Sequence, residues 1–271
     1  MANWVYVDHS YTSGSLFWGS TARRRRRLIK RVEDLSAQPT GSIPLASGGW
    51  AETKAAYRLL DTDALDWRKL LEIHTERTRE RLQGQPVALC LQDTTELDFT
   101  AQPEIAGLGR LSDEAQHGLY LHPTLVVTPE GVALGVIDAW IWARKPKDQP
   151  DVKESTRWVE GYMIVADLAE RTPATRFVYV ADREGDVRAL MDMAAQRTHA
   201  ADWLVRAQHN RKTASGDKLW FQVENTDALG EVEFTLPTAP GRAARRVRQT
   251  LYCDTVILPT PRKAAPNTKN H

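Results

Sequence analysis

Apolar side chains in the first part of the chain recur at helical spacing. In the first such segment they lie beside a basic face, and they are Leu28, Ile29, Val32 and Leu35. Further helices are expected over residues 50–60 and 65–82, after a polar loop at 38–49 that contains Pro and Gly. Residues 1–85 are therefore predicted to form a helical domain.

The pattern changes from helical to strand-like at Pro86. Residues 87–91 form a short apolar run between turn-forming residues, which is typical of a strand buried on both faces. Four later segments show strand patterns: 125–127, 132–137, 177–181 and 203–206. Helices are expected at 153–171 and 186–195. This order predicts an α/β class with a mixed sheet over residues 86–212.

Two local features refine this prediction. Pro129 to Gly131 are good turn-formers and predict a hairpin between the second and third strands. The helix at 153–171 is expected to bury one apolar face, made of Val159, Met163, Ile164, Ala166 and Leu168.

The pattern of hydrophobic and polar residues changes again in the last part of the chain. Strand patterns at 231–236 and 247–258 predict a smaller β region over residues 213–258. The tail 259–271 is rich in Pro, Lys and Asn and lacks periodicity, so it is expected to be disordered.

Composition limits the class of protein. With 271 residues, 42% of them hydrophobic, the chain fits one large domain or two small ones with a real core. Cys90 and Cys253 are too few and too far apart for a disulfide framework or a zinc site. There is no apolar run of membrane-spanning length and no secretory signal, so a cytoplasmic protein without a membrane partner is expected.

Charge is distributed unevenly although the net charge is only +1. Residues 21–31 contain seven basic side chains and no acidic one: Arg23, Arg24, Arg25, Arg26, Arg27, Lys30 and Arg31. A second basic stretch lies at 241–271. Such stripes in a neutral chain indicate local contact with phosphates, and a solvated basic face is the alternative.

Two aspartates follow predicted strands in matching positions. Asp93 ends the first strand and Asp182 ends the strand at 177–181. If these strands are neighbours, both carboxylates enter one small volume, where a hard cation such as Mg²⁺ would offset their repulsion. The alternative is that each Asp caps the turn or helix that follows it.

Several ordered motifs resemble one family. They are Gln92 to Leu97, His117-Gly118, His122, Trp140 to Arg144, Lys153 to Ser155 with Trp158, and Asp182 to Asp186, preceded by Arg24 to Leu28 and Ala55 to Leu60. In this set the chain resembles the IS-four family of insertion-sequence transposases, the group that includes the Tn-five transposase. The similarity extends over roughly residues 4–258.

The resemblance implies a DDE-type transposase with a ribonuclease H-like core and a β insertion. Asp93 and Asp182 match the first two of three acidic ligands for Mg²⁺ (or Mn²⁺). Such enzymes cut double-stranded DNA at transposon ends and join it to target DNA, usually as a synaptic homodimer. The resemblance also implies further DNA contacts at Arg183, Arg206, His209, Arg211 and Lys212. For Arg183, a salt bridge with Glu184 or Asp186 is the alternative.

The chain departs from the family at its third ligand. That ligand is a Glu within a Tyr-x-x-Arg-x-x-x-Glu-x-x-x-x-x-x-Lys signature, which this sequence lacks. The family's C-terminal dimerisation helices are absent too, so the chain is expected to be truncated, with a partial β insertion, and inactive alone. One alternative is a non-catalytic fragment that holds transposon ends through residues 20–85 and competes with a full-length enzyme. Another is an unrelated metal-dependent hydrolase.

Overall fold

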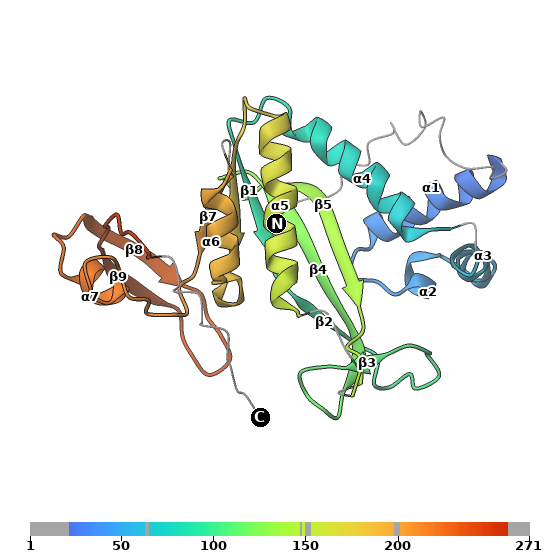
Figure 1. Cartoon of the computed structure of the whole chain (residues 1–271). Coiled ribbons are helices and arrows are strands. Elements are labelled where there is room, and N and C mark those ends of the chain that lie inside the picture. Colours follow the sequence, from blue (N-terminus) through green and yellow to red (C-terminus); the bar gives the residue numbers. More distant parts are fainter. Residues whose placement is uncertain (1–21, 63–64, 147, 150–152, 198–200, 260–271) are drawn as a thin grey trace, which may run out of the picture. The chain divides into compact units, whose positions relative to one another are not determined.

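The computed structural model in Figure 1 describes most of the chain, namely residues 22–62, 65–146, 148–149, 153–197 and 201–259. These residues form two compact units. The first runs to Glu80 and includes Gly135–Ile137, and the second holds Arg81–Leu134 and the residues from Asp138 onward. The predicted disordered tail lies outside the described residues, apart from its first residue. None of the described helices is long and apolar enough to cross a membrane.

The first unit is built from helices that the sequence predicts. They are α1 (Ala22–Ala37), α3 (Trp50–Leu60) and most of α4 (Trp67–Leu82). The expected loop at 38–49 is corrected in one respect, because it contains a short helix, α2 (Ile43–Ala46). Its first turn is stabilised by Ser42, whose Oγ accepts a hydrogen bond from the Leu45 amide. Helices α1, α2 and α3 contact one another.

Helix α4 is tied to the three strand residues that belong to the same unit. The Thr75 and Thr78 hydroxyls donate to the carbonyls of Ile137 and Val136, and the Val136 amide donates to His74 Nε2 at 2.9 Å. These bonds satisfy backbone groups of a strand that would otherwise need water.

A seven-stranded mixed sheet forms the centre of the second unit. Its strands are β1 (Val87–Gln92), β2 (Thr95–Asp98), β3 (Gly109–Arg110), β4 (His117–Val127), β5 (Ala133–Trp142), β6 (Arg176–Ala181) and β7 (Asp202–Val205). The order is β2-β4-β1-β6-β7, and β3 and β5 also pair with β4. Strand β1 is antiparallel to β4 and parallel to β6, which is parallel to β7. The predicted α/β class with a mixed sheet is confirmed.

The sequence underestimates the antiparallel part of this sheet. Strands β2 and β3 were not predicted, and β4 and β5 extend well beyond the expected segments. The hairpin turn between β4 and β5 is confirmed, with Gly131 at φ 84° and its amide bonded to the Thr128 carbonyl at 2.9 Å. Glycine suits this left-handed conformation because it has no Cβ.

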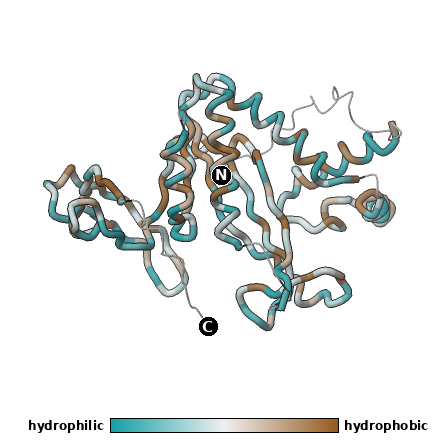
Figure 2. The backbone as a smooth tube through the Cα atoms, in the orientation of Figure 1, coloured by the Kyte–Doolittle hydropathy of each residue, from teal (hydrophilic) through white to brown (hydrophobic). Residues whose placement is uncertain are grey.

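One face of the central strands is the core. Residues 88, 90 and 92 of β1 are buried in register with Phe177, Tyr179 and Ala181 of β6. The opposite side of β1 is only partly buried, so the prediction of a strand buried on both faces is wrong in degree. Figure 2 shows apolar residues concentrated along these strands and on the helices α5 (Ser155–Arg171) and α6 (Arg188–Ala195).

Helix α5 turns a different face to the sheet than the sequence predicts. Its buried residues are Trp158, Gly161, Tyr162, Val165 and Ala166, and only Ala166 belongs to the predicted face. The apolar surface of this helix is wide, and the missing side chain of Gly161 decides the outcome. It lets the helix approach Gln92, which is itself buried.

Gln92 is the centre of a hydrogen-bond network that crosses the core. Its Nε2 donates to Thr124 Oγ1 at 3.1 Å, and its Oε1 accepts from the Tyr179 hydroxyl at 2.5 Å. The same hydroxyl also lies 3.1 Å from the Trp158 carbonyl. The buried Gln92 amide therefore has partners on β4 and β6, as a buried polar group must.

His122 on β4 lies at the edge of this core and is fully buried. Its Nδ1 is 2.8 Å from the Thr94 hydroxyl, and its ring meets Trp158 edge to face with centroids 4.7 Å apart. Burial lowers the pKa of His122 to about 4, although the charge of Asp93 opposes this. The imidazole is consequently neutral in the folded protein near pH 7.

The remaining described elements form a separate lobe of the second unit. Strands β8 (Gly230–Leu236) and β9 (Arg245–Leu251) pair as an antiparallel hairpin, preceded by α7 (Leu219–Glu224). The smaller β region is thus present. Strand β9 ends at Leu251 rather than at residue 258, and α7 was not predicted.

We expect Gly161→Ala to destabilise the second unit. A Cβ at this position would lie 1.8 Å from Gln92 Nε2, so the helix must move or Gln92 must lose its partners. Such overpacking costs about 1–3 kcal/mol, which outweighs the roughly 1 kcal/mol that Ala gains over Gly in a helix. Urea unfolding would measure the change. Gly230→Ala, where the new Cβ meets open space, is the control, and equal stability of both variants would contradict the packing described here.

We expect protonation of His122 to lower the free energy of unfolding at acidic pH. The unfolded chain takes up a proton at this residue as the pH falls through about 6.5, whereas the folded protein does so only near pH 4. Stability is therefore fully present above about pH 6.5 and declines toward pH 4, by an amount on the order of 3 kcal/mol. Unfolding free energies across this range should fall less steeply for His122→Gln than for the wild type. The exposed His117→Gln serves as the control, and equal slopes for His122→Gln and wild type would refute the assignment.

Candidate catalytic site and nucleic-acid interface

Asp93 and Asp182 lie at the same edge of the sheet, each directly after the end of its strand. The last register pair of β1 and β6 is Gln92 with Ala181, and the next residue of each parallel strand is the aspartate. The condition on which the sequence argument depended, that the two strands are neighbours, is therefore met. Both aspartates are exposed at this edge.

Both carboxylates also accept a backbone hydrogen bond from the segment that follows them. Asp93 Oδ1 accepts from the Thr94 amide at 2.9 Å, and Asp182 Oδ1 accepts from the Glu184 amide at 2.8 Å. Asp182 is the N-cap of a short 3₁₀ helix, η2 (Arg183–Gly185). The capping role considered for these residues is therefore filled by Asp182, whereas Asp93 bonds the amide of the next residue.

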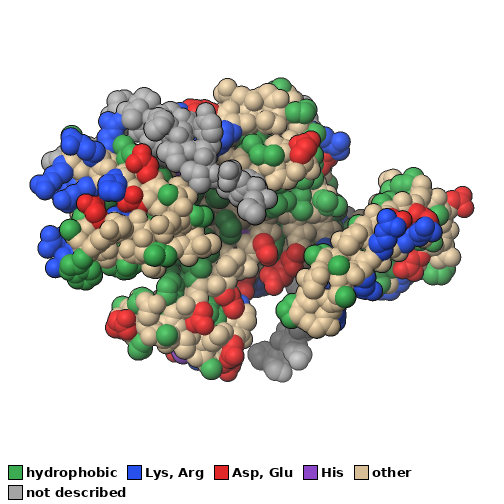
Figure 3. Space-filling model, turned by 180° about the vertical axis from the view of Figure 1, so that it is seen from behind, with side chains coloured by type: hydrophobic (Ala, Val, Ile, Leu, Met, Phe, Trp, Pro, Cys, Tyr) green, Lys and Arg blue, Asp and Glu red, His purple; other side chains and the backbone are tan. Residues whose placement is uncertain are grey.

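Glu184 belongs to the same acidic site, although the sequence analysis did not assign this residue to it. Burial and the negative charges of Asp182 and Asp93 raise the pKa of Glu184. Glu154, at the start of α5, adds to this effect, and Arg144 opposes it. In the sequence, the only signal that Glu184 belongs to this site was its position two residues after Asp182. Figure 3 shows Asp and Glu side chains gathered on one part of this face of the molecule.

Arg144 and Arg157 lie on an aromatic surface beside this site. Arg144 is ion-paired with Glu154, and its guanidinium stacks 4.3 Å from the centroid of the Tyr120 ring. Arg157 lies 4.2 Å from the Trp140 ring. Stacking and pairing fix both guanidinium groups, which are less able than exposed ones to change partners.

The other basic residues expected near the site differ in exposure. Arg183, on η2, and Arg206, His209 and Lys212, after β7, are exposed. Arg211 instead forms an ion pair with Asp186, at 2.5 Å between Nη1 and Oδ1, and its side chain is only 16% exposed. The partner of Asp186 in the described structure is thus Arg211, and not Arg183.

The arginine run lies on α1, as predicted. Arg23, Arg24, Arg26 and Arg27 are exposed, and Arg25 is half-buried. Lys30 is ion-paired with Asp34 one turn later, at 3.1 Å. Figure 3 shows Lys and Arg side chains gathered over the helical unit, which agrees with a phosphate-binding surface on α1.

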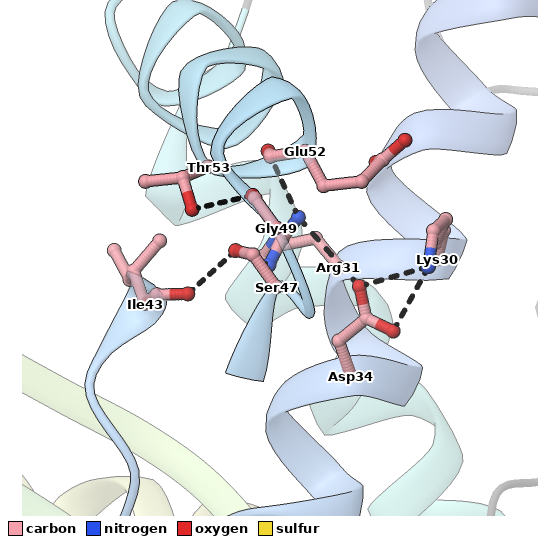
Figure 4. A network of polar contacts seen from close by, with 8 residues as sticks. All are labelled: Lys30, Arg31, Asp34, Ile43, Ser47, Gly49, Glu52 and Thr53. Carbon is pink, nitrogen blue, oxygen red and sulfur yellow. Dashed lines mark hydrogen bonds and ion pairs between the residues drawn. The ribbon is translucent and has the colours of Figure 1, made fainter. Parts of the chain in front are cut away.

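Arg31 corrects the predicted set of DNA contacts. It is the buried residue of α1, and Figure 4 shows it pointing into the helical unit. Its Nη1 donates to Ser47 Oγ at 2.7 Å, and its Nη2 reaches the Glu52 carbonyl at 3.4 Å and Asp34 at 3.6 Å. A side chain held in this way joins α1 to α3 and is not presented to DNA.

Within the ranges that the structure describes, no group of three or more His, Cys, Asp or Glu side chains is arranged to hold a metal ion. The carboxylates of Asp93 and Asp182 directly follow the ends of β1 and β6, and the Glu184 carboxylate lies two residues after Asp182.

Comparison with known families gives one match. The family described as transposase DNA-binding matches residues 21–65, which span α1, α2 and α3. No curated protein matches the sequence. Two solved structures are similar to a low degree: the Mos1 transposase paired-end complex with left transposon end, at 14% identity and a TM-score of 0.25, and the Mos1 strand transfer complex, at 13% and 0.24.

These similarities cover 69% of this chain in both cases, and 60% and 59% of the two Mos1 chains. The chain therefore spans about three fifths of those proteins. The family match supports a transposase, and it does so through the DNA-binding segment at residues 21–65.

Proposed function

We propose that this chain is a DDE-type transposase of the IS-four kind. In this proposal α1–α3 bind transposon-end DNA, and Asp93 and Asp182 are two ligands of the catalytic metal. The observation that carries the proposal is the parallel pairing of β1 with β6, because an Asp directly follows each of these two strands. Earlier in the chain, residues 21–65 match the transposase DNA-binding family.

The donor set fits Mg²⁺ or Mn²⁺. Mg²⁺ takes one or two carboxylates and completes its coordination with water and substrate phosphate oxygens. Burial and then the negative charges of Asp182 and Asp93 raise the pKa of Glu184, and a divalent cation would relieve the repulsion between these charges. When bound, such an ion supplies charge neutralisation and polarisation of the phosphodiester.

The protein's own groups have defined tasks in this scheme. The Thr94 and Glu184 amides orient the two carboxylates through hydrogen bonds to their Oδ1 atoms. His122 and Trp158 support the turn after β1 from inside the core. Exposed cations such as Arg183 attract the phosphates of the substrate, as expected for contacts that carry charge and no sequence information.

Binding of DNA requires cations that the fold does not use itself. On α1 the exposed arginines meet this requirement, and Arg31 does not. Double-stranded transposon ends are the proposed ligand. Two protomers holding two ends would form the synaptic homodimer that such transposases use.

A second candidate function is DNA binding without catalysis. The observation that favours it is that Asp93 and Asp182 each already accept a backbone hydrogen bond, from the amides of Thr94 and Glu184, and this structural role requires no metal. In that case the chain would occupy transposon ends and compete with an active enzyme.

We expect Arg24→Gln/Arg27→Gln to weaken binding to a DNA duplex and to reduce its salt dependence. Each lost phosphate contact lowers the slope of log K against log salt by about 0.9, so two contacts lower it by about two. Fluorescence anisotropy at several salt concentrations would measure the slope.

Arg110→Gln/Arg171→Gln removes the same charge from exposed arginines elsewhere and is the control. An unchanged slope for the α1 variant, or an equal loss in the control, would argue against α1 as the phosphate-binding surface. Arg31→Gln would be uninformative as a contact test, because it removes a buried tie between α1 and α3.

We expect Asp93→Asn and Asp182→Asn each to lower the affinity for Mn²⁺ by about tenfold or more, since each removes a charged ligand. Electron paramagnetic resonance of free Mn²⁺, in the presence of a short DNA duplex, would measure binding without requiring activity. Asp167→Asn, on the exposed side of α5, is the control. If the strand-end variants bind Mn²⁺ as the wild type does while DNA binding persists, the non-catalytic function is favoured.

A further inference from the structure

The segment from Arg206 to Lys212, here called the 206–212 loop, begins beside the candidate site. The Arg206 amide donates to the Ala181 carbonyl at 3.2 Å, so the loop departs from β7 next to the residue that precedes Asp182. Arg206 and Lys212 are exposed. The loop therefore presents cations close to the edge where β6 ends.

Asp186 holds the middle of this loop. Its Oδ2 accepts hydrogen bonds from the amides of Gln208 and His209, at 2.8 and 2.9 Å. Its Oδ1 accepts from Arg211 Nη1 at 2.5 Å, and its carbonyl accepts from Arg211 Nη2 at 2.8 Å. The Asp186 side chain is only 1% exposed, so this carboxylate serves the loop rather than solvent.

The electrostatics of Asp186 agree with a charged anchor. Burial alone would raise its pKa, but the hydrogen bonds from His209 and Gln208 and the charge of Arg211 together keep the pKa below its usual range. A buried carboxylate with two amide donors and a guanidinium is stable as an anion. Removing its charge would leave these donors without their acceptor.

The far end of the loop is fixed by the first turn of α7 and by Lys218, the residue before it. The Leu219 amide donates to the Arg211 carbonyl at 2.8 Å, and the Trp220 amide donates to Asn210 Oδ1 at 3.0 Å. Lys212 forms a β-bridge with Lys218. The loop is thus attached at its start, its middle and its end, and Asp186, the residue after η2, contributes the negative charge to this attachment.

We propose that Asp186 is a positioning residue that shapes the 206–212 loop into a phosphate-binding arm next to Asp182. In this arrangement Arg206 and Lys212 contact DNA, and Arg211 is the internal counter-charge of Asp186. This inference rests on the proposed function, because DNA is its ligand. It assigns the last Asp of the Asp182–Asp186 run to the loop and not to the metal.

The test compares Asp186→Asn with Asp192→Asn. Both remove one negative charge, and Asp192 lies on α6 in an exposed ion pair with Arg188. Affinity for a random-sequence DNA duplex is measured over a range of salt. We expect Asp186→Asn to bind less tightly and to lower the salt slope by about one to two, the loss of one or two phosphate contacts. Asp192→Asn should keep the wild-type slope.

A double-mutant cycle separates positioning from a general loss of structure. Arg206→Gln/Lys212→Gln is introduced into the wild type and into Asp186→Asn. If Asp186 acts through the loop, neutralising the loop weakens wild-type binding but adds little in the Asp186→Asn background. Fully additive effects would overturn the proposal.

Arg211→Lys replaces Asp186→Asn if the latter does not fold, as judged by circular dichroism. Lysine keeps the positive charge but loses the two-pronged contact with Asp186. A lower salt slope for this variant is expected if the loop must be held, and an unchanged slope overturns the proposal. Failure of the wild type to bind DNA would instead remove the proposed function, so the two failures are distinguishable.

Discussion

The parallel pairing of β1 with β6 is the constraint on which the rest of the second unit depends. Gln92 and Ala181 are its last register pair, and both candidate ligands follow directly. A slip of one residue would turn every side chain of β1 to the opposite face. It would also move Gln92 out of the core, where its amide bridges Thr124 and Tyr179. The geometry of the site is therefore decided in the core.

A buried glutamine is a costly choice for a central strand unless every polar atom is satisfied. Here the hydrogen bonds of Gln92 offset the cost of its burial, and they also specify where α5 packs on the sheet. Gly161 leaves the space that the Gln92 amide fills, and the Tyr179 hydroxyl, which donates to Gln92, also lies 3.1 Å from the Trp158 carbonyl of α5. Apolar side chains alone would tolerate several positions of α5 over the sheet. The hydrogen-bond network selects one, and it thereby also fixes Trp158 against His122 beneath the turn after β1.

Sequence periodicity located most of the elements but did not identify which face of each is buried. The apolar run at 87–91 and the helical spacing in α1 correctly located those elements, because burial imposes a period on the chain. The face of α5 was predicted wrongly, since periodicity counts apolar residues and gives no weight to the space left by Gly161. Strand β2 was missed because its residues are largely exposed and show no apolar alternation. The neighbouring aspartates could be anticipated, but the pKa of Glu184 depends on groups from three separate segments.

Positive charge in the sequence is a poor guide to DNA contact until the fold's own demand for cations is known. Arg31 and Arg211 both belonged to the predicted DNA-binding set. Each is withdrawn from the surface by an acceptor far along the chain, Ser47 in one case and Asp186 in the other, at separations of 16 and 25 residues. Local sequence cannot reveal such partners, because the contact exists only after the chain has folded. An arginine whose guanidinium is held by internal oxygens has lost the donors that a phosphate would need. The cations available for the proposed DNA contacts are those that no internal acceptor holds, and this criterion selects among the arginines of α1 and of the 206–212 loop for the same physical reason.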